Sequence, residues 1–251
     1  MNLRYIALHM DIDSGYKDPF RDNFNLNSRF ISNYLSIQIR KLKLETDGTF
    51  NMISVIPSID IKDSCKIVGE KALQARIAFN KEVYVQLSEI EKHEYYLQLL
   101  EEGYKVCVKH KKIPLEQLLK LHQDFRSNGY KNEWLHKKKK FKEQGIEVSM
   151  NCFFTSIDFQ LIMSVFDIKS KIELVSGTVI RTLPNEVCFD SLFKDVIIEN
   201  DELIITEYQD RPKFKFLLTD INKGRFSFEV MNVGLEYKPL KYPPPLPPGV
   251  L

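Results

Sequence analysis

One long helical stretch, from Ser88 to Gly145, interrupts a chain whose remaining sequence is mostly strand-like. In its first part, the residues of one face recur at steps of three and four, which is the spacing of a helix with a single buried face. Ser88 and Glu91 have the spacing of a capping box, which satisfies backbone N–H groups at the start of a helix. A helical insert between strand-like segments predicts an α+β protein. The stripe consists of Ile90, His93, Leu97, Leu100 and Tyr104.

Two more helices are expected within this insert. One begins at Pro114, whose fixed φ suits a first helical turn, and ends at Asn128-Gly129. A third, shorter helix is expected from Asn132 to Gln144, with Gly145 as its C-cap. Gly103 is either tolerated inside the first helix or ends it early. The side chains expected in the helical core are Leu97, Leu100, Leu118 and Phe125.

The segment before the insert predicts several strands. Apolar and polar residues alternate from Asn2 to Ile12, and the even-numbered positions are expected to face the core. Residues Ser14–Ser28 are rich in Asn and Asp and predict a connection. One or two further strands are expected between Cys65 and Leu87.

A hairpin is predicted around Asp47-Gly48. Both central residues of a type I′ turn need a positive φ, so Asp-Gly between apolar runs is a strong hairpin signal. The two arms would be Tyr34–Leu44 and Phe50–Ile56. The first arm changes parity near Arg40-Lys41, which indicates either a bulge or a short helix before a shorter strand.

After the insert, apolar residues recur with period two from Ile146 to Met231. The links between these runs are short, and Asn200-Asp201 and Asn222-Lys223-Gly224 have the composition of hairpin turns. Successive strands are therefore expected to pair antiparallel as a meander. Pro184–Lys194 is a looser stretch that predicts one or two helical turns.

The expected architecture is a single α+β unit over residues 1–251, with a largely antiparallel sheet and an inserted basic helical segment at 88–145. If the unit has two lobes, residues 1–87 form the N-terminal strand-rich lobe and 146–240 form the meander. Residues 241–251 are a Pro-rich tail that predicts polyproline II. The tail either lies against its own domain, stays disordered, or binds an aromatic groove of another protein.

Charge is distributed unevenly along the chain. Lys105–Lys142 contains eleven Lys and one Arg against three acids, a net of +9, although the whole chain carries only +2. Four consecutive lysines are not expected to find enough acids nearby. The predicted partner-binding surface is therefore basic, unless the acidic segment Glu186–Asp210 serves instead. The residues of the predicted basic surface are Trp134, Lys137, Lys138, Lys139, Lys140 and Lys142.

His9, Asp11 and Asp13 lie on one side of the first predicted strand, a spacing that three ligands of a divalent ion could share. Acidic residues are also common where a strand gives way to a Ser-Gly turn. We therefore predict that these three side chains are solvated or structural, and that no metal is bound.

The four cysteines, Cys65, Cys107, Cys152 and Cys188, are far apart in sequence and form no C-x-x-C motif. This spacing predicts neither a zinc site nor a disulfide framework. Reduced and mostly buried thiols, as in a cytoplasmic protein, are expected.

The sequence contains no G-x-S-x-G, no P-loop, no G-x-G-x-x-G and no H-E-x-x-H. It therefore predicts neither an enzyme nor a bound cofactor. Charged residues within the first twenty positions exclude a secretory signal, and no apolar run approaches the roughly 20 residues of a membrane span. The expectation is a cytoplasmic protein without membrane association.

A chain of this size that is rich in Lys, Ile, Asn and Phe, polarised in charge and without catalytic motifs resembles the immunity proteins of bacterial polymorphic-toxin systems. The resemblance implies tight, stoichiometric neutralisation of a toxin domain, either by blocking its active site or by holding it away from its catalytic conformation. No family motif is part of the resemblance, so no residue role follows from it. Complementary charge would speed the capture of such a partner.

Two alternatives use the same residues differently. A nucleic-acid-binding protein would place the basic helices on phosphates, although the pI of about 8.2 is below the usual value for such domains. A metal-dependent nuclease would add His9, Asp11 and Asp13 as metal ligands.

Overall fold

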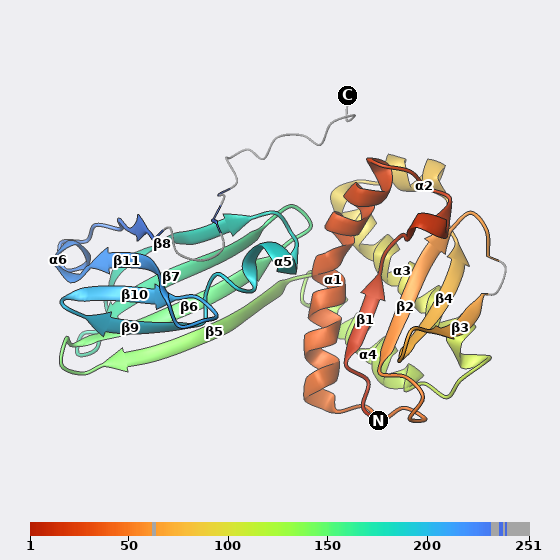
Figure 1. Cartoon of the computed structure of the whole chain (residues 1–251), viewed down its shortest axis with the longest axis horizontal. Coiled ribbons are helices and arrows are strands. Elements are labelled where there is room, and N and C mark those ends of the chain that lie inside the picture. The colour runs from red at the N-terminus through yellow and green to blue at the C-terminus, as the bar shows by residue number, and fades with distance from the viewer. Residues whose placement is uncertain (62–63, 232–235, 238, 240–251) are drawn as a thin grey trace. The chain divides into compact units, whose positions relative to one another are not determined.

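The computed structural model describes residues 1–61, 64–231, 236, 237 and 239, and the fold is α+β, as the sequence predicts (Figure 1). The chain divides into two compact units after Asn132. This boundary falls inside the segment 88–145 that the sequence treats as one helical insert. Each unit has its own sheet or sheets and its own core. The Pro-rich tail, 241–251, lies outside the described residues.

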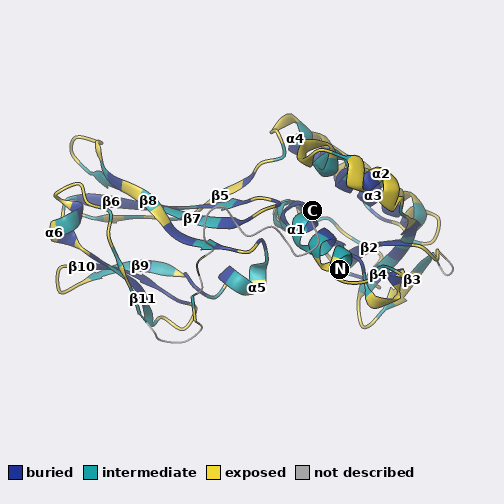
Figure 2. Ribbon diagram, turned by 90° about the horizontal axis from the view of Figure 1, so that it is seen from above, coloured by how far each residue is buried: buried dark blue, intermediate teal, exposed yellow. Residues whose placement is uncertain are grey.

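Unit 1 packs helices against a four-stranded mixed sheet with the order β1-β2-β4-β3. Strands β1 and β4 both run parallel to β2, and β3 runs antiparallel to β4. Figure 2 shows α2, α3 and α4 on one side of this sheet. The elements are β1 (Tyr5–Leu8), η1 (Ile12–Ser14), α1 (Phe20–Leu42), β2 (Met52–Ser58), β3 (Cys65–Val68), β4 (Ala72–Ala78), α2 (Lys81–Gln86), α3 (Glu89–Val108) and α4 (Leu115–Ser127).

The first two helices predicted in the insert are confirmed as α3 and α4. The capping box forms, with the Ser88 N–H donating to the Glu91 carboxylate at 2.8 Å. Gly103 lies inside α3, which continues to Val108. The four residues predicted for the helical core, Leu97, Leu100, Leu118 and Phe125, are all buried.

The predicted hairpin around Asp47-Gly48 is wrong, because its first arm belongs to helix α1. Ile31, Leu35 and Ile39 are fully buried and stand four residues apart, which is the spacing of one helix face. The parity change in Tyr34–Leu44 is a consequence of this helical period. Asp47-Gly48 does form a turn, with φ +90° at Gly48, but the turn leads from α1 into β2. Strand β2 then pairs with β1 in parallel.

Helix α1 also closes the free edge of β1, the outermost strand of the sheet. The N–H of Ile6 donates to Ser36 Oγ at 3.0 Å, and the N–H of Leu8 donates to Ser32 Oγ at 3.1 Å. These serines are four residues apart and therefore share one face of the helix. The helix begins at Phe20, inside the stretch that the sequence predicts as a connection. Its polar side chains replace a neighbouring strand and leave this edge unavailable for pairing.

Unit 2 contains two four-stranded sheets, with the orders β5-β6-β7-β8 and β12-β11-β10-β9. Figure 2 shows them as two layers. Phe159 is fully buried in the core of this unit, stacked on Phe189 with ring centroids 3.6 Å apart. The elements are β5 (Asn132–Phe141), β6 (Ile146–Phe154), β7 (Phe159–Asp167), β8 (Glu173–Thr182), α5 (Glu186–Phe189), β9 (Asp195–Glu199), β10 (Glu202–Thr206), β11 (Pro212–Leu217), α6 (Leu218–Ile221) and β12 (Glu229–Val230).

The predicted meander is confirmed from β6 to β8 and from β9 to β11, where successive strands pair antiparallel. Asn200 and Asp201, with φ values of +49° and +62°, form the tight turn between β9 and β10. The expected helical turn after Pro184 is α5. Asn222-Lys223-Gly224 differs from the prediction, because it follows α6 within a longer link between β11 and β12.

The third predicted helix is wrong, because Asn132–Phe141 is strand β5 at the edge of its sheet. Lysine is acceptable in a helix by propensity, and it is also favoured on edge strands, where its charge prevents pairing with another chain. Gly145 does adopt a left-handed conformation, with φ +69°, but it serves the turn into β6 rather than a helix end.

Candidate functional site

The lysine run of the predicted partner surface is paired with acids inside unit 2. Lys138 Nζ lies 2.8 Å from one carboxylate oxygen of Glu147 on β6, and Lys140 Nζ lies 3.5 Å from the other. The hydrogen bond from Lys138 lowers the pKa of the Glu147 carboxyl. The expectation that the lysines lack acids nearby is therefore wrong.

The other two lysines of the run bridge β5 to β9, the edge strand of the second sheet. Lys137 Nζ and Lys139 Nζ lie 3.3 and 3.7 Å from the two carboxylate oxygens of Asp195. Lys139 also donates to the backbone carbonyl of Val196 at 2.8 Å. Part of the charge contrast between the basic run and the acidic segment Glu186–Asp210 is thus an internal attraction that holds two sheet edges together.

The remaining predicted residues differ in environment. Trp134 is half-buried, with its ring centroid 6.1 Å from that of Phe159 in the core. Lys142 is exposed in the turn after β5. A residue that was not predicted, His136, extends the bridge to β9 through Nε2, which lies 3.0 Å from the carbonyl oxygen of Lys194.

Replacing Lys139 with Met is expected to lower the free energy of unfolding by about 1 kcal/mol, because the edge carbonyl of Val196 loses its donor. Methionine keeps an unbranched apolar stem, so the change removes mainly the charge and the hydrogen bond. Urea unfolding measures the effect. Lys142→Met on the exposed turn is the matched control and should stay within about 0.5 kcal/mol of the parent. Equal effects at the two positions would contradict the bridging role of Lys139.

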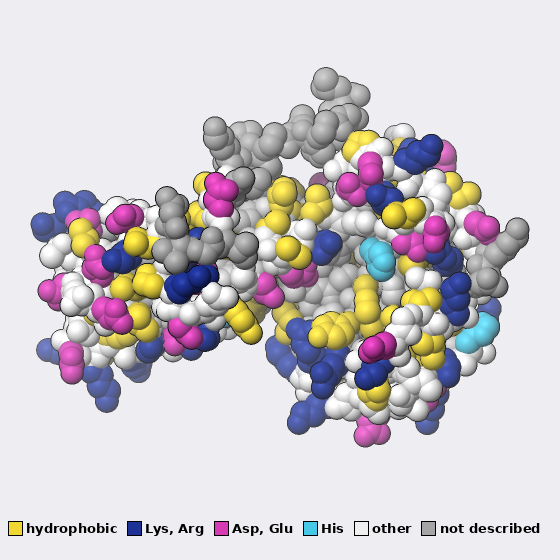
Figure 3. All heavy atoms as spheres, viewed as in Figure 1, with side chains coloured by type: hydrophobic (Ala, Val, Ile, Leu, Met, Phe, Trp, Pro, Cys, Tyr) yellow, Lys and Arg dark blue, Asp and Glu magenta, His cyan; other side chains and the backbone are white. Residues whose placement is uncertain are grey.

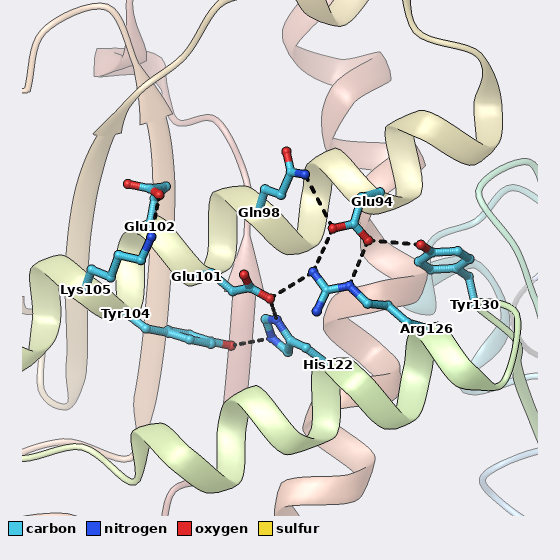
Figure 4. A network of polar contacts seen from close by, with 9 residues as sticks. All are labelled: Glu94, Gln98, Glu101, Glu102, Tyr104, Lys105, His122, Arg126 and Tyr130. Carbon is cyan, nitrogen blue, oxygen red and sulfur yellow. Dashed lines mark hydrogen bonds and ion pairs between the residues drawn. The ribbon is translucent and has the colours of Figure 1, made fainter.

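A polar network joins α3 to α4 (Figure 4). Arg126 of α4 donates from Nε and Nη2 to the two carboxylate oxygens of Glu94, both at 2.8 Å, and its Nη2 also lies 2.9 Å from Glu101. The same Glu101 oxygen lies 3.0 Å from His122 Nδ1, and His122 Nε2 lies 3.3 Å from the Tyr104 hydroxyl. Three charged groups and two aromatic ones therefore form a continuous chain between the helices.

A carboxylate, an imidazole and a phenol in a row have the geometry of a proton relay. Here His122 and Tyr104 are both fully buried. A substrate would have no access to the end of the relay at the Tyr104 hydroxyl. The network therefore satisfies polar groups at a helix–helix contact, and it fixes how α4 sits on α3.

This network predicts a loss of stability in acid. Hydrogen bonds from His122, and then from Arg126, lower the pKa of Glu101 below its ordinary value of 4.5, against the opposing effect of burial. Well above pH 4.5 the carboxylate is charged in both states and its contribution is complete. As the pH falls from 4.5 towards the lowered pKa, the unfolded state takes up the proton first, so the free energy of unfolding decreases.

Urea unfolding at several pH values between 3 and 6 measures this dependence. In Glu101→Gln the decrease between pH 4.5 and pH 3 should be smaller than in the parent, because one titrating group has been removed. An identical slope in the two proteins would show that Glu101 does not titrate differently in the folded state.

His9, Asp11 and Asp13 do not converge on a common point. The Asp11 carboxylate forms a two-oxygen ion pair with Arg76 of β4. Burial lowers the pKa of His9, which favours its neutral form, and Asp13 lies in the short helix η1. Across residues 1–61, 64–231 and the few described beyond them, no group of three or more His, Cys, Asp or Glu side chains is placed to hold a metal ion.

Segments that follow the carboxyl ends of the parallel strands β1, β2 and β4 line a hollow of about 560 Å³. In sheets with parallel strands, ligands bind preferentially beyond the carboxyl ends of the strands. Aromatic residues Tyr16 and Phe20 line it, with ring centroids 5.6 Å apart. Lys17, Asp18, Lys81 and Glu82 add two charges of each sign. The hollow is therefore an open concavity with an aromatic lining and balanced charge.

Ile59 lines this hollow, and two more exposed isoleucines, Ile12 and Ile61, belong to the same two connections between elements. We call Ile12, Ile59 and Ile61 the isoleucine rim. Their exposed fractions are 81%, 65% and 48%. Ile12 follows β1, and the other two follow β2. Figure 3 shows hydrophobic side chains among scattered charges on the face of unit 1 turned to the viewer.

The two loops of the rim are fastened to each other. The N–H of Ile59 donates to the Ser14 carbonyl at 2.9 Å, and the Ser58 hydroxyl donates to the same carbonyl at 3.2 Å. Gly15 has φ +84°, and a Cβ there would lie 3.0 Å from Ile59. Only glycine combines this backbone conformation with such a close approach. The two connections are thus held together at Ser14 and Ile59. Sequence periodicity does not reveal this site, because its residues come from loops far apart in the chain.

Comparisons of this chain with family models, with curated proteins and with solved structures found no match. Within the described part of the chain, no helix combines the length and the apolar character needed to cross a bilayer.

Proposed function

We propose that this protein works by binding another protein, as an immunity or inhibitor protein that neutralises a toxin domain, and that the isoleucine rim and its hollow form the contact surface. The observation that carries the proposal is the exposure of three isoleucines on two connections that are hydrogen-bonded to each other. Large apolar side chains grouped around a concavity are typical of interaction surfaces.

Energetics support this use of the rim. Burying one isoleucine side chain contributes about 1.5–3 kcal/mol. Because Ile59 is already held by the hydrogen bonds to Ser14, little conformational entropy of this residue is lost when a partner binds. The aromatic lining of the hollow can accept an apolar side chain of the partner, and the four charges around it can pair with polar groups at the edge.

Co-expression with the product of each adjacent open reading frame, followed by size-exclusion chromatography and calorimetry, tests the proposal. A partner should bind at one-to-one stoichiometry, and Ile59→Asp should weaken binding by at least about 30-fold, as expected for a central contact worth 2 kcal/mol or more. Ile172→Asp, at a residue of unit 2 that is 64% exposed, is the matched control and should bind like the parent. Unchanged binding by Ile59→Asp would place the partner surface elsewhere.

Nucleic-acid binding is a second candidate, favoured by one specific observation. Four exposed cations belong to the C-terminal end of α1 and the start of β1, where the Arg40 guanidinium lies 5.8 Å from the ring centroid of Tyr5, a residue that is 47% exposed. They are Arg4, Arg40, Lys41 and Lys43. Part of this charge offsets the negative end of the helix dipole. If these residues bind phosphates, affinity for a DNA duplex should fall steeply with salt and should be lost in Lys41→Glu/Lys43→Glu.

A further inference from the structure

Two of the four cysteines meet at the edge of the sheet in unit 1. Cys65 is the first residue of β3 and pairs with Ala75 of β4, whose side chain is buried. Cys107 lies on α3, four residues after Gly103, the residue through which the helix touches β2. One helical turn separates Gly103 from Cys107, so Cys107 faces the same sheet as Gly103. The two thiols are close enough to affect each other: besides burial, which raises the pKa of both, the interaction with Cys65 raises the pKa of Cys107, and the interaction with Cys107 lowers the pKa of Cys65.

We propose that Cys65 and Cys107 are a modification site, at which a small disulfide such as oxidised glutathione converts the two thiols into an intramolecular disulfide. The pairing differs from what the sequence predicts, because 42 positions separate the two residues and no motif marks them. Formation of this disulfide is a property separate from the proposed protein-binding function and does not depend on that function.

The chemistry is a thiol–disulfide exchange in two steps. Cys65 is the more accessible thiol, since it is half-buried while Cys107 is buried. The Cys65 thiolate attacks one sulfur of oxidised glutathione, forms a mixed disulfide and releases one glutathione thiolate, which takes up the proton lost from Cys65. The Cys107 sulfur then attacks Cys65 Sγ, and the second glutathione leaves with the proton of Cys107. Two protein thiols are oxidised, and one glutathione disulfide is reduced to two thiols.

The surroundings of Cys65 influence the first step. Burial raises the pKa of the Cys65 thiol, while the hydrogen bond from Cys107 and the positive charge of Lys111 act in the opposite direction. Lys111 itself is held 3.2 Å from Asp47. The thiolate is the attacking species, so the reaction should accelerate as pH rises from 7 to 9. Lys111→Gln should slow it, because a charge that favours the thiolate is removed.

The bond would fasten the edge strand β3 to helix α3. Strand β3 has only four residues, and among the described strands it pairs with β4 alone. Cys65 also ends the connection that carries Ile59 and Ile61 from β2 to β3. Oxidation would therefore fix the residue at which this connection enters β3.

The experiment treats the full chain with oxidised glutathione under native conditions and digests it without reduction. Mass spectrometry should find a peptide that links Cys65 to Cys107, with free thiols falling from four to two. The thermal midpoint should rise by about 5–10 °C, because the cross-link restricts the unfolded chain, and dithiothreitol should reverse the rise. Cys65→Ser and Cys107→Ser should each abolish both changes.

Cys188→Ser is the matched control, since Cys188 is also half-buried but lies in unit 2. It should behave like the parent. Two outcomes would overturn the proposal. One is a stable glutathione adduct on Cys65 with no linked peptide, which would mean that the two sulfurs cannot reach bonding geometry. The other is a linked peptide that involves Cys152 or Cys188 instead. Neither outcome bears on partner binding, which is measured with the reduced protein.

Discussion

Truncating Leu118 to Ala is expected to lower the free energy of unfolding by about 2–5 kcal/mol, since it removes a fully buried side chain from the contact face of α4. The same face carries Phe125, whose ring stacks on Tyr34 of α1 with centroids 4.2 Å apart. Helix α4 packs against both α1 and α3, so a cavity at Leu118 can collapse only in part. Urea unfolding at neutral pH measures the loss.

Leu119→Ala provides the control, because it makes the same chemical change one residue further along the same helix. Leu119 is 38% exposed, and the change in helix propensity is identical. Its effect should stay below about 1 kcal/mol. If the two variants lose equal stability, the orientation of α4 differs from the one described.

Replacing Gly103 with Ala is expected to destabilise the protein by about 1–3 kcal/mol, although alanine is the better helix former by about 1 kcal/mol. A Cβ at this position would lie 2.3 Å and 2.7 Å from the two methyl carbons of Val55 and 3.0 Å from its Cβ. Because all three atoms are too close, no rotation of the valine side chain relieves the contact. Val55 is fully buried on the central part of the sheet and has no room to withdraw.

A double-mutant cycle separates the steric effect from the propensity effect. Val55→Ala should itself be destabilising through loss of buried surface, but in that background Gly103→Ala should become neutral or stabilising. Thermal or urea unfolding of the four proteins gives the coupling energy. A stabilising effect of Gly103→Ala in the parent would show that α3 does not approach β2 as closely as described.

The lysine run shows how one local pattern can fit two structures. The helix propensity of lysine makes Lys137–Lys140 compatible with a helix. Helix propensities of ordinary residues differ by only about 0.7 kcal/mol, so they do not decide between helix and strand here. The strand is favoured because β5 can join β6, and because Asp195 and Glu147 supply partners for the ammonium groups. Asp195 is 56 positions from Lys139, so no window of local sequence contains the information.

The sequence failed to predict helix α1 for a different reason. Its Ser and Asn residues favour turns when their side chains have no other partner. In the folded protein, Ser32 and Ser36 accept hydrogen bonds from the backbone of β1. The polar residues of α1 recur at four-residue steps, which is the period of a helix. That these residues face a strand edge cannot be inferred from the local sequence.

The sequence by itself determined the elements whose signals are local: α3 with its capping box at Ser88, α4 with its buried leucines, the strands β6 to β8 and the turn at Asn200-Asp201. Each depends on the period of burial or on backbone conformations that few residues adopt. Only the tertiary structure decided the parallel pairing of β1 with β2, the strand β5, the contact between Cys65 and Cys107, and the isoleucine rim. These features join residues that are distant in the chain, and their free energy comes from contacts that exist only after the chain has folded.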